Sequence, residues 1–520
     1  MKFPSDLRWS PTRRAVLSGA AKLGLAATFA GTAFGGARAE TPRKGGTLRL
    51  ALAGGSSNDT LDPRTFTEPV VRNIAVSICN KLVEILPDGT MAPELAESWE
   101  TKGGSTWIVT LRKDVTFHNG KTLEAADVIY SINLHRGDES SSGAKGIFSA
   151  IKDIRSDSKN QITFELEQPN ADFMASFADL HALIVPEGFT DFNNLVGTGG
   201  YTLETFQPGL RATVGKNPNY WRSDRAHVDS VEFTVVNDAT ARVTALRSGA
   251  ADIVNRMDRK IVKLLANDPN IEIVRSPGGL HWTFVALANA KQTSDNNVRM
   301  ALKHAFDRQK VLDSVFSGLG SIGNDHPILP SNPYYNADLP QHELDPDKSK
   351  FYLEKAGLDQ LTLDLFTSDA VYPEALDMAA HFQSSAAGGN VNLNIVRRPA
   401  DGYWADTWMK VPFCMSVWFT RPIDQTFSLI YKSGAAWNES FWSNERFDKL
   451  LAEGQATLDF DKRKEIYGEM QAILHGEGPS VIPVFADYLD AKGSRVRGFE
   501  PSVVSDLSGD KVAERVWLAD

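Results

Sequence analysis

Residues 80–132 read NKLVEILPDGTMAPELAESWETKGGSTWIVTLRKDVTFHNGKTLEAADVIYSI, and this stretch decides the fold. Within it, residues 105–118 alternate apolar and polar side chains and then turn, which predicts a β-hairpin with one buried face. The dipeptides Asp88-Gly89 and Asn119-Gly120 are typical of hairpin turns, and residues 123–136 then have helical spacing. The segment therefore predicts a sheet packed on a helix, with a core built largely by aromatic residues. The apolar positions of the predicted hairpin are Trp107, Val109, Leu111, Val115 and Phe117.

Strands and helices alternate along the rest of the chain, which indicates a mixed α/β architecture. Residues 231–254 are predicted to form a strand, a helix and a strand, and residues 361–369 and 391–399 are strands that flank a helix. Residues 298–316 have apolar side chains at the spacing of one amphipathic helix, and residues 444–475 are predicted to form helices. At 520 residues the chain is too long for a single hydrophobic core, so two or three lobes are expected.

Residues 1–39 have the layout of an export signal. Arg13-Arg14 precede the weakly apolar stretch AVLSGAAKLGLAATFAGTAFGG, and Ala37-Arg38-Ala39 forms a small-x-small cleavage site. The paired arginines and the glycine- and alanine-rich segment indicate a twin-arginine signal that is cleaved near Ala39. A membrane anchor is the alternative, but Lys22 and the glycines interrupt the apolar run that a membrane span needs. The mature chain is therefore predicted to be a periplasmic protein without membrane insertion.

Charge is distributed unevenly along the chain. The formal net charge is −10, although residues 1–39 carry six basic residues against the single acid Asp6. The mature chain is therefore strongly acidic, which disfavours nucleic acid and anionic membranes as partners. Cys79 and Cys414 are the only cysteines. An exported protein could pair them, but two buried free thiols are the simpler expectation.

Short matches to catalytic motifs occur, but none has the context that its chemistry requires. Gly318, Gly320 and Gly323 match G-x-G-x-x-G, yet they follow a helix and precede a proline-rich segment, where no helix N-terminus can hold a pyrophosphate. Ser142-x-x-Lys145 matches one β-lactamase element without the Lys-Thr-Gly that completes the set. There is no G-x-S-x-G, Walker A or H-E-x-x-H motif, and the histidines are scattered. The sequence thus predicts no enzyme activity, no cofactor and no bound metal.

The segment that decides the fold also resembles the signature region of the family-5 extracellular solute-binding proteins of ABC importers. Similar segments follow in order at residues 197–209, 216–221, 245–253, 298–312 and 353–358, and Gly200 is a departure, since the family usually has proline there. The resemblance covers about residues 45–490 and identifies a family, not a ligand. The matches within the signature are Asp88-Gly89, Pro93, Leu95-Ala96, Ser98-Trp99, Leu111-Arg112, Val115, Phe117-His118, Gly120 and Ala126-Asp127-Val128.

This resemblance implies an α/β, two-lobe periplasmic binding protein fold of the large, class II-like type, with mixed sheets joined by hinge strands. Lobe I would comprise residues 40–277, with an extra subdomain at about 76–198, and lobe II would comprise residues 278–485. Residues 486–520 would return to lobe I. A small solute would be enclosed and desolvated between the lobes, and the permease and ATPase subunits of an ABC importer would receive it. A monomer is expected by analogy.

Residues 416–442, SVWFTRPIDQTFSLIYKSGAAWNESFW, contain several candidate ligand-binding residues. In dipeptide-binding relatives a tryptophan in this stretch is followed by an aspartate that pairs with the amine of the ligand. This chain has Trp418, but Arg421 stands near the position of the expected acid, and Asp424 lies three residues further on. The anchor for the amine of a peptide therefore looks altered.

A second anchor also looks altered, because the loop after residues 361–366 would carry a carboxylate-binding arginine in such relatives and here has Asp369 and Tyr372. Arg421 suits a bidentate grip on a carboxylate, so we expect the ligand to carry one. Asp369 or Asp424 could hold a cationic group. An internal ion pair of Arg421 is the alternative interpretation.

Tryptophans are dense in this part of the chain, and some of them could stack on a ring or flank a cation, although most are expected to be core residues. Trp404 is the candidate that lies before residues 416–442. The candidate ligand-binding residues are Trp418, Arg421, Asp424, Tyr372, Trp404 and Asp369.

The sequence therefore predicts capture of a small amino-acid-like solute, namely a peptide, an opine or a modified amino acid, for import. An oligosaccharide or a chelated metal is the alternative cargo for the same scaffold. An exported hydrolase, or a chaperone or sensory receptor, would be a different class of protein. Saturable stabilisation by a solute without turnover would distinguish a binding protein from a hydrolase.

Overall fold

The computed structural model describes residues 41–519, apart from residues 67, 138, 266, 369, 373, 400–402 and 436. The predicted export signal, with Arg13, Arg14 and Ala39, lies outside the described residues and stays a prediction.

A mixed sheet of twelve strands contains most of the β-structure of the described residues. Its main path runs β15-β14-β16-β12-β18-β11-β1-β10-β9-β8, with β13 beside β18 and β17 beside β12. β1 lies parallel to β10 and β11, and β14 lies parallel to β15 and β16, whereas β12 is antiparallel to its neighbours β16, β17 and β18. The strands are β1 (Thr47–Leu52), β8 (Tyr201–Gln207), β9 (Arg211–Lys216), β10 (Ser230–Val235), β11 (Ile253–Val254), β12 (Ile271–Ala286), β13 (Gly320–Ile322), β14 (Leu361–Thr367), β15 (Val391–Arg397), β16 (Phe413–Trp418), β17 (Ser480–Val481) and β18 (Val484–Gly493).

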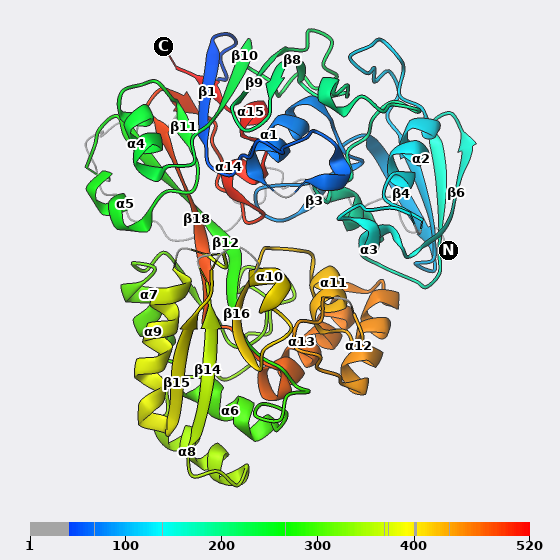
Figure 1. Cartoon of the computed structure of the whole chain (residues 1–520). Helices are drawn as coiled ribbons and strands as arrows, with labels where there is room; N and C mark the ends of the chain where they lie inside the picture. The colour runs from blue at the N-terminus through cyan, green and yellow to red at the C-terminus, as the bar shows by residue number, and fades with distance from the viewer. Residues whose placement is uncertain are drawn as a thin grey trace, which may run out of the picture. The chain divides into compact units, whose positions relative to one another are not determined.

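Separate hydrophobic cores form at the two ends of this sheet, and we call the parts built on them lobe I and lobe II (Figure 1). In lobe I, Leu48 and Val231 of the sheet share a core with Ile74 and with the C-terminal residues Val512 and Val516. The end of the chain therefore packs in the same core as its first strand. The helices of this lobe include α1 (Pro69–Ile78), α4 (Ala239–Arg247), α5 (Arg259–Leu265), α14 (Asp506–Gly509) and α15 (Val512–Arg515), and the two short strands β19 (Val496–Arg497) and β20 (Trp517–Leu518) pair near the C-terminus.

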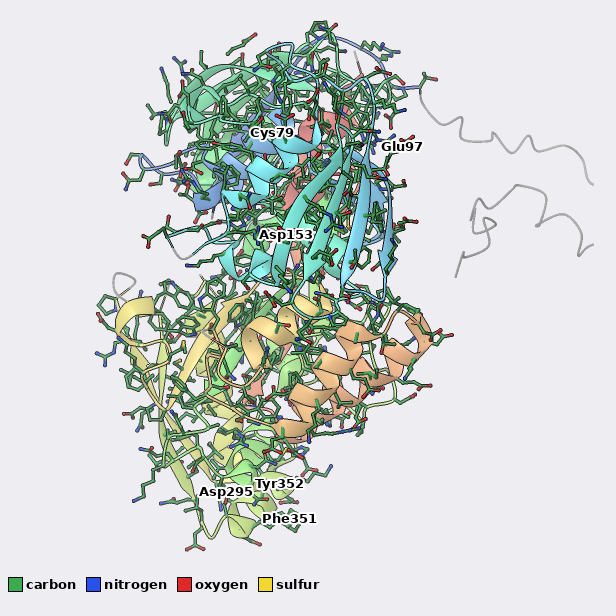
Figure 2. The ribbon with its side chains drawn as sticks, turned by 90° about the vertical axis from the view of Figure 1, so that its right-hand side faces the viewer. Cys79, Glu97, Asp153, Asp295, Phe351 and Tyr352 are labelled. Carbon is green, nitrogen blue, oxygen red and sulfur yellow. The ribbon has the colours of Figure 1, made fainter. Side chains whose placement is uncertain are left out.

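A second core of lobe I lies under an antiparallel sheet with the order β4-β5-β7-β6 and involves residues between Leu82 and Ile184 (Figure 2). Trp107 and Val109 of β5 face Val128 and Ile132 of α2 in this core. The sequence alternation of residues 106–111 therefore places its apolar side chains on the helix-covered face. The elements are β2 (Val83–Ile85), β3 (Met91–Pro93), β4 (Ala96–Lys102), β5 (Thr106–Leu111), β6 (Ile151–Ser158), β7 (Gln161–Leu166), α2 (Ala125–Asn133) and α3 (Lys145–Phe148).

Lobe II has two large cores of its own, besides a small cluster around Val285, Leu287 and Cys414. Parallel strands β14 and β15 pack with β16 and with the connecting helix α9 in one of the large cores, whereas helices α12 and α13 and the residues around Trp418 form the other. The helices are α6 (Asn296–His304), α7 (Arg308–Ser314), α8 (Pro346–Lys355), α9 (Ala375–Ala386), α10 (Tyr403–Asp406), α11 (Ile423–Thr426), α12 (Glu445–Ala456) and α13 (Phe460–Glu477), and a π-helical turn spans Phe427–Tyr431.

Strands β12 and β18 run from lobe I into lobe II side by side (Figure 1). Their pairing shifts register between Ser276 and Leu280, where Pro277-Gly278-Gly279 interrupts the ladder. A side chain at Gly278 would collide with the backbone carbonyl of Ala486. Only glycine fits this close approach of two backbones, so the bulge between the lobes is fixed by the sequence.

Most predicted elements are confirmed, but two are wrong. Residues 105–118 are not a hairpin, because β5 pairs with β4 and β7, while residues 115–123 form a separate turn closed by a bridge between Thr116 and Thr122. Residues 298–316 are not one helix, because α6 ends at His304 and a second helix, α7, begins at Arg308. Asp307 accepts a hydrogen bond from the backbone N–H of Lys310, and such a cap starts a new helix.

We expect Gly278→Ala to lower the free energy of unfolding by about 1–3 kcal/mol, since the added methyl group must displace a packed backbone. Urea denaturation followed by tryptophan fluorescence would measure the change. Gly476→Ala in α13 is the matched control, because its methyl group would meet no atom within 4 Å. The control should be neutral or stabilising by up to about 1 kcal/mol, and equal losses in both variants would contradict the close approach at Gly278.

Candidate solute-binding site

Trp418 ends strand β16 at the boundary between the lobes and pairs across the sheet with His281 of β12. Its side chain is only 6% exposed. The indole Nε1 donates a hydrogen bond of 2.9 Å to Glu439 Oε1, and the ring lies 6.1 Å from that of Trp437. The indole of Trp418 is therefore held in one orientation.

Glu439 is a buried carboxylate that organises this region. Besides Trp418, it accepts hydrogen bonds from Thr283 Oγ1 at 2.9 Å and from Trp408 Nε1 at 2.8 Å. Burial raises the pKa of Glu439, and the hydrogen bonds from these donors counteract the rise. A buried charge is tolerated when donors satisfy it. Because two of these donors are indole N–H groups, the Glu439 carboxylate fixes the orientation of both Trp408 and Trp418.

Arg421 follows Trp418 by three residues, and its Cζ lies 5.8 Å from the centroid of the Trp418 ring. Its Nη1 is buried and has no hydrogen-bond partner among the described residues, and no ion pair joins the guanidinium to them. Burial lowers the pKa of Arg421, and Asp179 of lobe I counteracts this without forming an ion pair. A buried guanidinium nitrogen without a hydrogen-bond partner is unusual, and this distinguishes Arg421 among the predicted site residues.

Other unsatisfied polar groups lie beside Arg421. Within the described residues, Thr420 Oγ1 and His281 Nε2 are buried and have no hydrogen-bond partner. His281 Nδ1 lies 2.9 Å from the carbonyl oxygen of Gly279, and burial lowers the pKa of His281 to about 4. His281 is therefore neutral at pH 7, and its Nε2 is a further buried polar atom without a partner among the described residues.

Asp179 is the lobe I group that faces Arg421. Burial alone would raise the pKa of Asp179, but the hydrogen bond with His181 Nδ1 at 2.6 Å keeps it below its ordinary value. Asp179 is therefore an ionised carboxylate across the lobe boundary. No ion pair within the described part of the chain joins it to Arg421.

The other predicted site residues lie in different surroundings. Tyr372 is half-buried beside Trp282, with ring centroids 5.4 Å apart, and its pKa is raised by burial and influenced by Arg256, Arg259 and Asp506 of lobe I. Trp404 of α10 is 41% exposed and contacts Trp408 edge to face at 5.9 Å. Asp369 lies outside the described residues, so its predicted role stays a prediction.

Asp424 lies in a separate cluster. Its carboxylate accepts a hydrogen bond of 3.4 Å from Asn170 Nδ2 of lobe I, and it is 4% exposed. The structure therefore brings Trp418 and Arg421 together and places Asp424 on an adjoining contact between the lobes.

Sequence reasoning missed Asp179, Glu439 and His281. These residues come from parts of the chain that are far apart in sequence, and no motif surrounds them. Glu439 is recognised by its burial and its three donors, Asp179 by its position opposite Arg421, and His281 by its unpartnered Nε2, and all three features become visible only in three dimensions.

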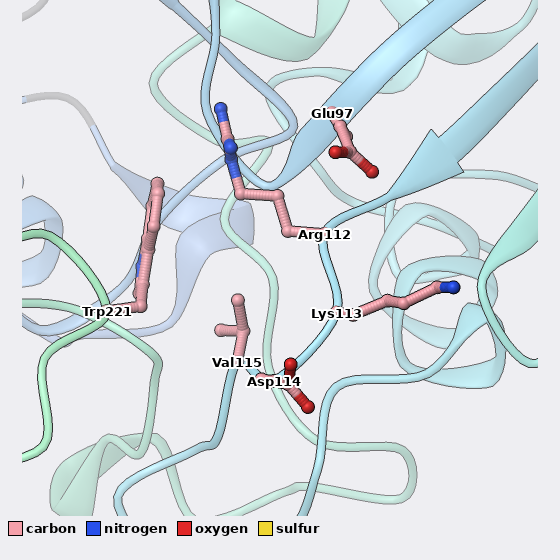
Figure 3. A pocket seen from close by; sticks show the side chains of 6 residues that line it. All are labelled: Glu97, Arg112, Lys113, Asp114, Val115 and Trp221. Atoms are coloured by element: carbon pink, nitrogen blue, oxygen red, sulfur yellow. The ribbon is translucent and has the colours of Figure 1, made fainter.

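A concavity of about 480 Å³ lies on lobe I beside the signature segment (Figure 3). The guanidinium of Arg112 lies 5.1 Å from the Trp221 ring there. None of the predicted site residues lines it, so it is separate from the region around Arg421. Its lining residues are Glu97, Arg112, Lys113, Asp114, Val115 and Trp221.

Two searches of the described residues gave no site of another kind. None of their helices combines the length and the apolar character that crossing a membrane requires. Nor do three or more of their histidine, cysteine, aspartate or glutamate side chains gather where they could hold a metal ion. Cys79 and Cys414 are both buried and free, as predicted from the sequence.

Two α/β lobes joined by continuous strands, with unsatisfied polar side chains at their boundary, define a two-lobe binding protein. Residues 90–440 match the family model described as bacterial extracellular solute-binding proteins, family 5, middle. The chain belongs to the family-5 bacterial extracellular solute-binding proteins.

Known relatives agree with this membership. The dipeptide-binding protein of Escherichia coli K12 is 25% identical over 93% of this chain and 96% of its own length. The structure of HbpA2 from Haemophilus parasuis matches with a TM-score of 0.80 at 22% identity, covering 91% of this chain and 100% of that one. The structure of the PBP AgaA in complex with agropinic acid, from A. tumefaciens R10, matches with a TM-score of 0.78 at 23% identity. The match covers 91% of this chain and 99% of that one. The predicted two-lobe α/β fold with mixed sheets is confirmed.

We expect Glu439→Ala to lower the free energy of unfolding by about 2–4 kcal/mol, because the buried donors of Trp408, Trp418 and Thr283 would lose their acceptor. Urea denaturation would measure this loss, and the tryptophan emission of the folded protein should shift. Glu445→Ala, at an exposed position in the first turn of α12, is the control and should change stability by less than about 1 kcal/mol. Equal stability of the Glu439 variant and the control would contradict the role assigned to Glu439.

Proposed function

We propose that the mature chain captures a small, carboxylate-bearing, amino-acid-like solute between its lobes and presents it to an ABC importer. The chain belongs to a solute-binding family, and the proposal concerns which solute it binds and where. Peptides, opines and modified amino acids all fit this description.

The unpartnered guanidinium of Arg421 carries the proposal. A planar guanidinium that is buried, lies beside an aromatic ring and lacks a protein anion is suited to a bidentate contact with a carboxylate. Trp418, Thr420 and His281 would complete the lobe II half of the site, and Tyr372 and Trp404 stay further candidates from the same lobe. The relative AgaA was solved with agropinic acid, and the E. coli relative is named a dipeptide-binding protein, which supports amino-acid-derived ligands.

Lobe closure is the proposed mechanism of capture. Residues 40–277 and 486–520 would move as lobe I, with the subdomain at about 76–198, and residues 278–485 as lobe II. The register shift between Ser276 and Leu280 supports a hinge at this boundary. Closure would place Asp179 opposite Arg421 and remove water from the bound solute, which strengthens its polar contacts. A solute stabilises the closed form by its higher affinity for that form.

Export and delivery follow from the same proposal. Relatives in the family are periplasmic binding proteins, and a twin-arginine signal in residues 1–39, cleaved near Ala39, would bring this chain to the periplasm. The proposed partners are the permease and ATPase subunits of an importer in the inner membrane. The protein would act as a monomer without a cofactor and without turnover of its solute.

A hydrolase would need an activated nucleophile, and Ser142 is a candidate because its hydroxyl contacts a histidine. Its Oγ lies 2.6 Å from His135 Nδ1. However, within the described residues His135 Nε2 is buried without a hydrogen-bond partner, so no acid orients the imidazole as a catalytic triad requires. Burial also lowers the pKa of His135 to about 4. This pair supports a structural role better than catalysis.

Thermal unfolding against a library of amino acids, dipeptides, opines, sugars and chelated metals would test the proposed solute class. A carboxylate-bearing amino-acid derivative at one hundred times its Kd should stabilise the protein by about 2.7 kcal/mol, and mass spectrometry should recover it chemically unchanged. Stabilisation by sugars or metal chelates alone would contradict the proposal.

Arg421→Ala should weaken binding of the carboxylate-bearing hit by about 2–4 kcal/mol, or roughly 30- to 1,000-fold, as measured by calorimetry. The methyl ester of the same hit should bind wild type weakly and be little affected by the substitution. Arg446→Ala is the matched control, because Arg446 is exposed and pairs with Glu469 at the surface of lobe II. Equal affinity of wild type and Arg421→Ala for the free acid would exclude the carboxylate contact.

A further inference from the structure

A loop of lobe I, residues 170–172, contacts three helices of lobe II. The backbone N–H of Ala171 donates a hydrogen bond of 2.6 Å to the carbonyl oxygen of Gln455 in α12. Asn170 Nδ2 donates to Asp424 of α11 at 3.4 Å. These contacts join residues more than 250 positions apart, so they exist only while the two lobes touch.

Asp172 is the charged residue of this loop. One of its oxygens pairs with Arg463 Nη1 of α13 at 2.8 Å, and the other accepts a hydrogen bond from Tyr467 Oη at 3.2 Å. Arg463 also lies over the ring of Tyr334 at 5.2 Å. Arg463 is therefore already engaged by Asp172.

Asp424 brings a second carboxylate into the same cluster without bringing a cation. Its Oδ1 is buried and has no hydrogen-bond partner among the described residues. The titratable and charged groups that face it are Asp172 of lobe I, Arg463 and Tyr467 of α13, and Tyr334. Two carboxylates thus lie near one arginine in a largely buried cluster, which leaves an excess negative charge.

Burial and the neighbouring Asp172 raise the pKa of Asp424 to about 7. Burial also raises the pKa of Asp172, against the opposing effect of Arg463. When the lobes separate, Asp172 leaves with lobe I while Asp424 and Arg463 stay together on lobe II. Both carboxylates would then return to water and to ordinary values near 4.

We propose that Asp172 and Asp424 form a shared proton-binding site that exists only while the lobes are in contact, so that closure takes up a proton. The sign of the effect follows from linkage. A group with a higher pKa in the closed form favours closure at low pH, and this contribution is lost as the pH rises through about 7. The inference goes beyond the proposed solute and does not depend on its identity.

Single-molecule energy transfer between dyes on the two lobes, without any solute, tests the proposal. Asp153→Cys on β6 (Figure 2) and Lys449→Cys on α12 place the dyes at exposed positions of lobe I and lobe II. The native Cys79 and Cys414 are 1% and 0% exposed, so they should not compete for the dyes. The ratio of closed to open molecules should fall about tenfold between pH 6 and pH 8, as expected for one group with a pKa of about 7 in the closed form.

Asp424→Asn keeps the shape of the side chain and removes its titration. The ratio of closed to open molecules of this variant should therefore change less than twofold between pH 6 and pH 8. Asp172→Asn should flatten the response as well, because Arg463 is then free to pair with Asp424. Asp461→Asn, an exposed acid in the first turn of α13, is the matched control and should keep the tenfold change. A change of less than twofold in wild type, or a tenfold change retained by Asp424→Asn, would overturn the proposal.

Discussion

The pairing of β12 with β18 on both sides of the lobe boundary is the constraint on which the rest of the structure depends. The ladder runs from Ile271 beside Gly493 in lobe I to His281 beside Phe485 in lobe II, and it is interrupted only at Pro277-Gly278-Gly279. Because the hydrogen bonds continue on either side, the two lobes keep a fixed register while the glycines can absorb a change in angle. The same strand places His281 next to Trp418, so the hinge and the candidate site share one element.

The polar groups at the lobe boundary differ in how far the protein itself supplies their hydrogen-bond partners. Glu439 is buried with all its donors in place, and a satisfied buried carboxylate stiffens what it contacts. Arg421, which lies over the indole that Glu439 holds, has a buried nitrogen without a partner among the described residues. Leaving a buried donor unpaired costs free energy of about 1–3 kcal/mol. The contrast between the fully satisfied Glu439 and the unpartnered Arg421 supports the proposal that a solute contacts Arg421.

The fold was largely predictable from the sequence, whereas the site was predictable only in part. The alternation of Trp107, Val109 and Leu111 gave a strand with a buried face because this pattern is local. The helix predicted for residues 298–316 was wrong, since the cap at Asp307 outweighed continuous apolar spacing. Trp418 and Arg421, two of the predicted site residues, lie together, and their role in binding stays a prediction. The partners of Asp424 could not be predicted, because Asn170 is 254 positions away.

Arg421 and Asp424 carry opposite charges only three positions apart, yet no ion pair joins them within the described residues. Pro422 between them is extended, with φ −51° and ψ 146°, so Arg421 stays with the end of β16 while Asp424 begins the turn of α11. The chain therefore cannot neutralise either charge with the other. Under the two proposals, Arg421 would receive an anion and Asp424 a proton. Closure around a carboxylate together with a proton would add no net charge to the buried boundary, and this balance lowers the electrostatic cost of closing a water-free site.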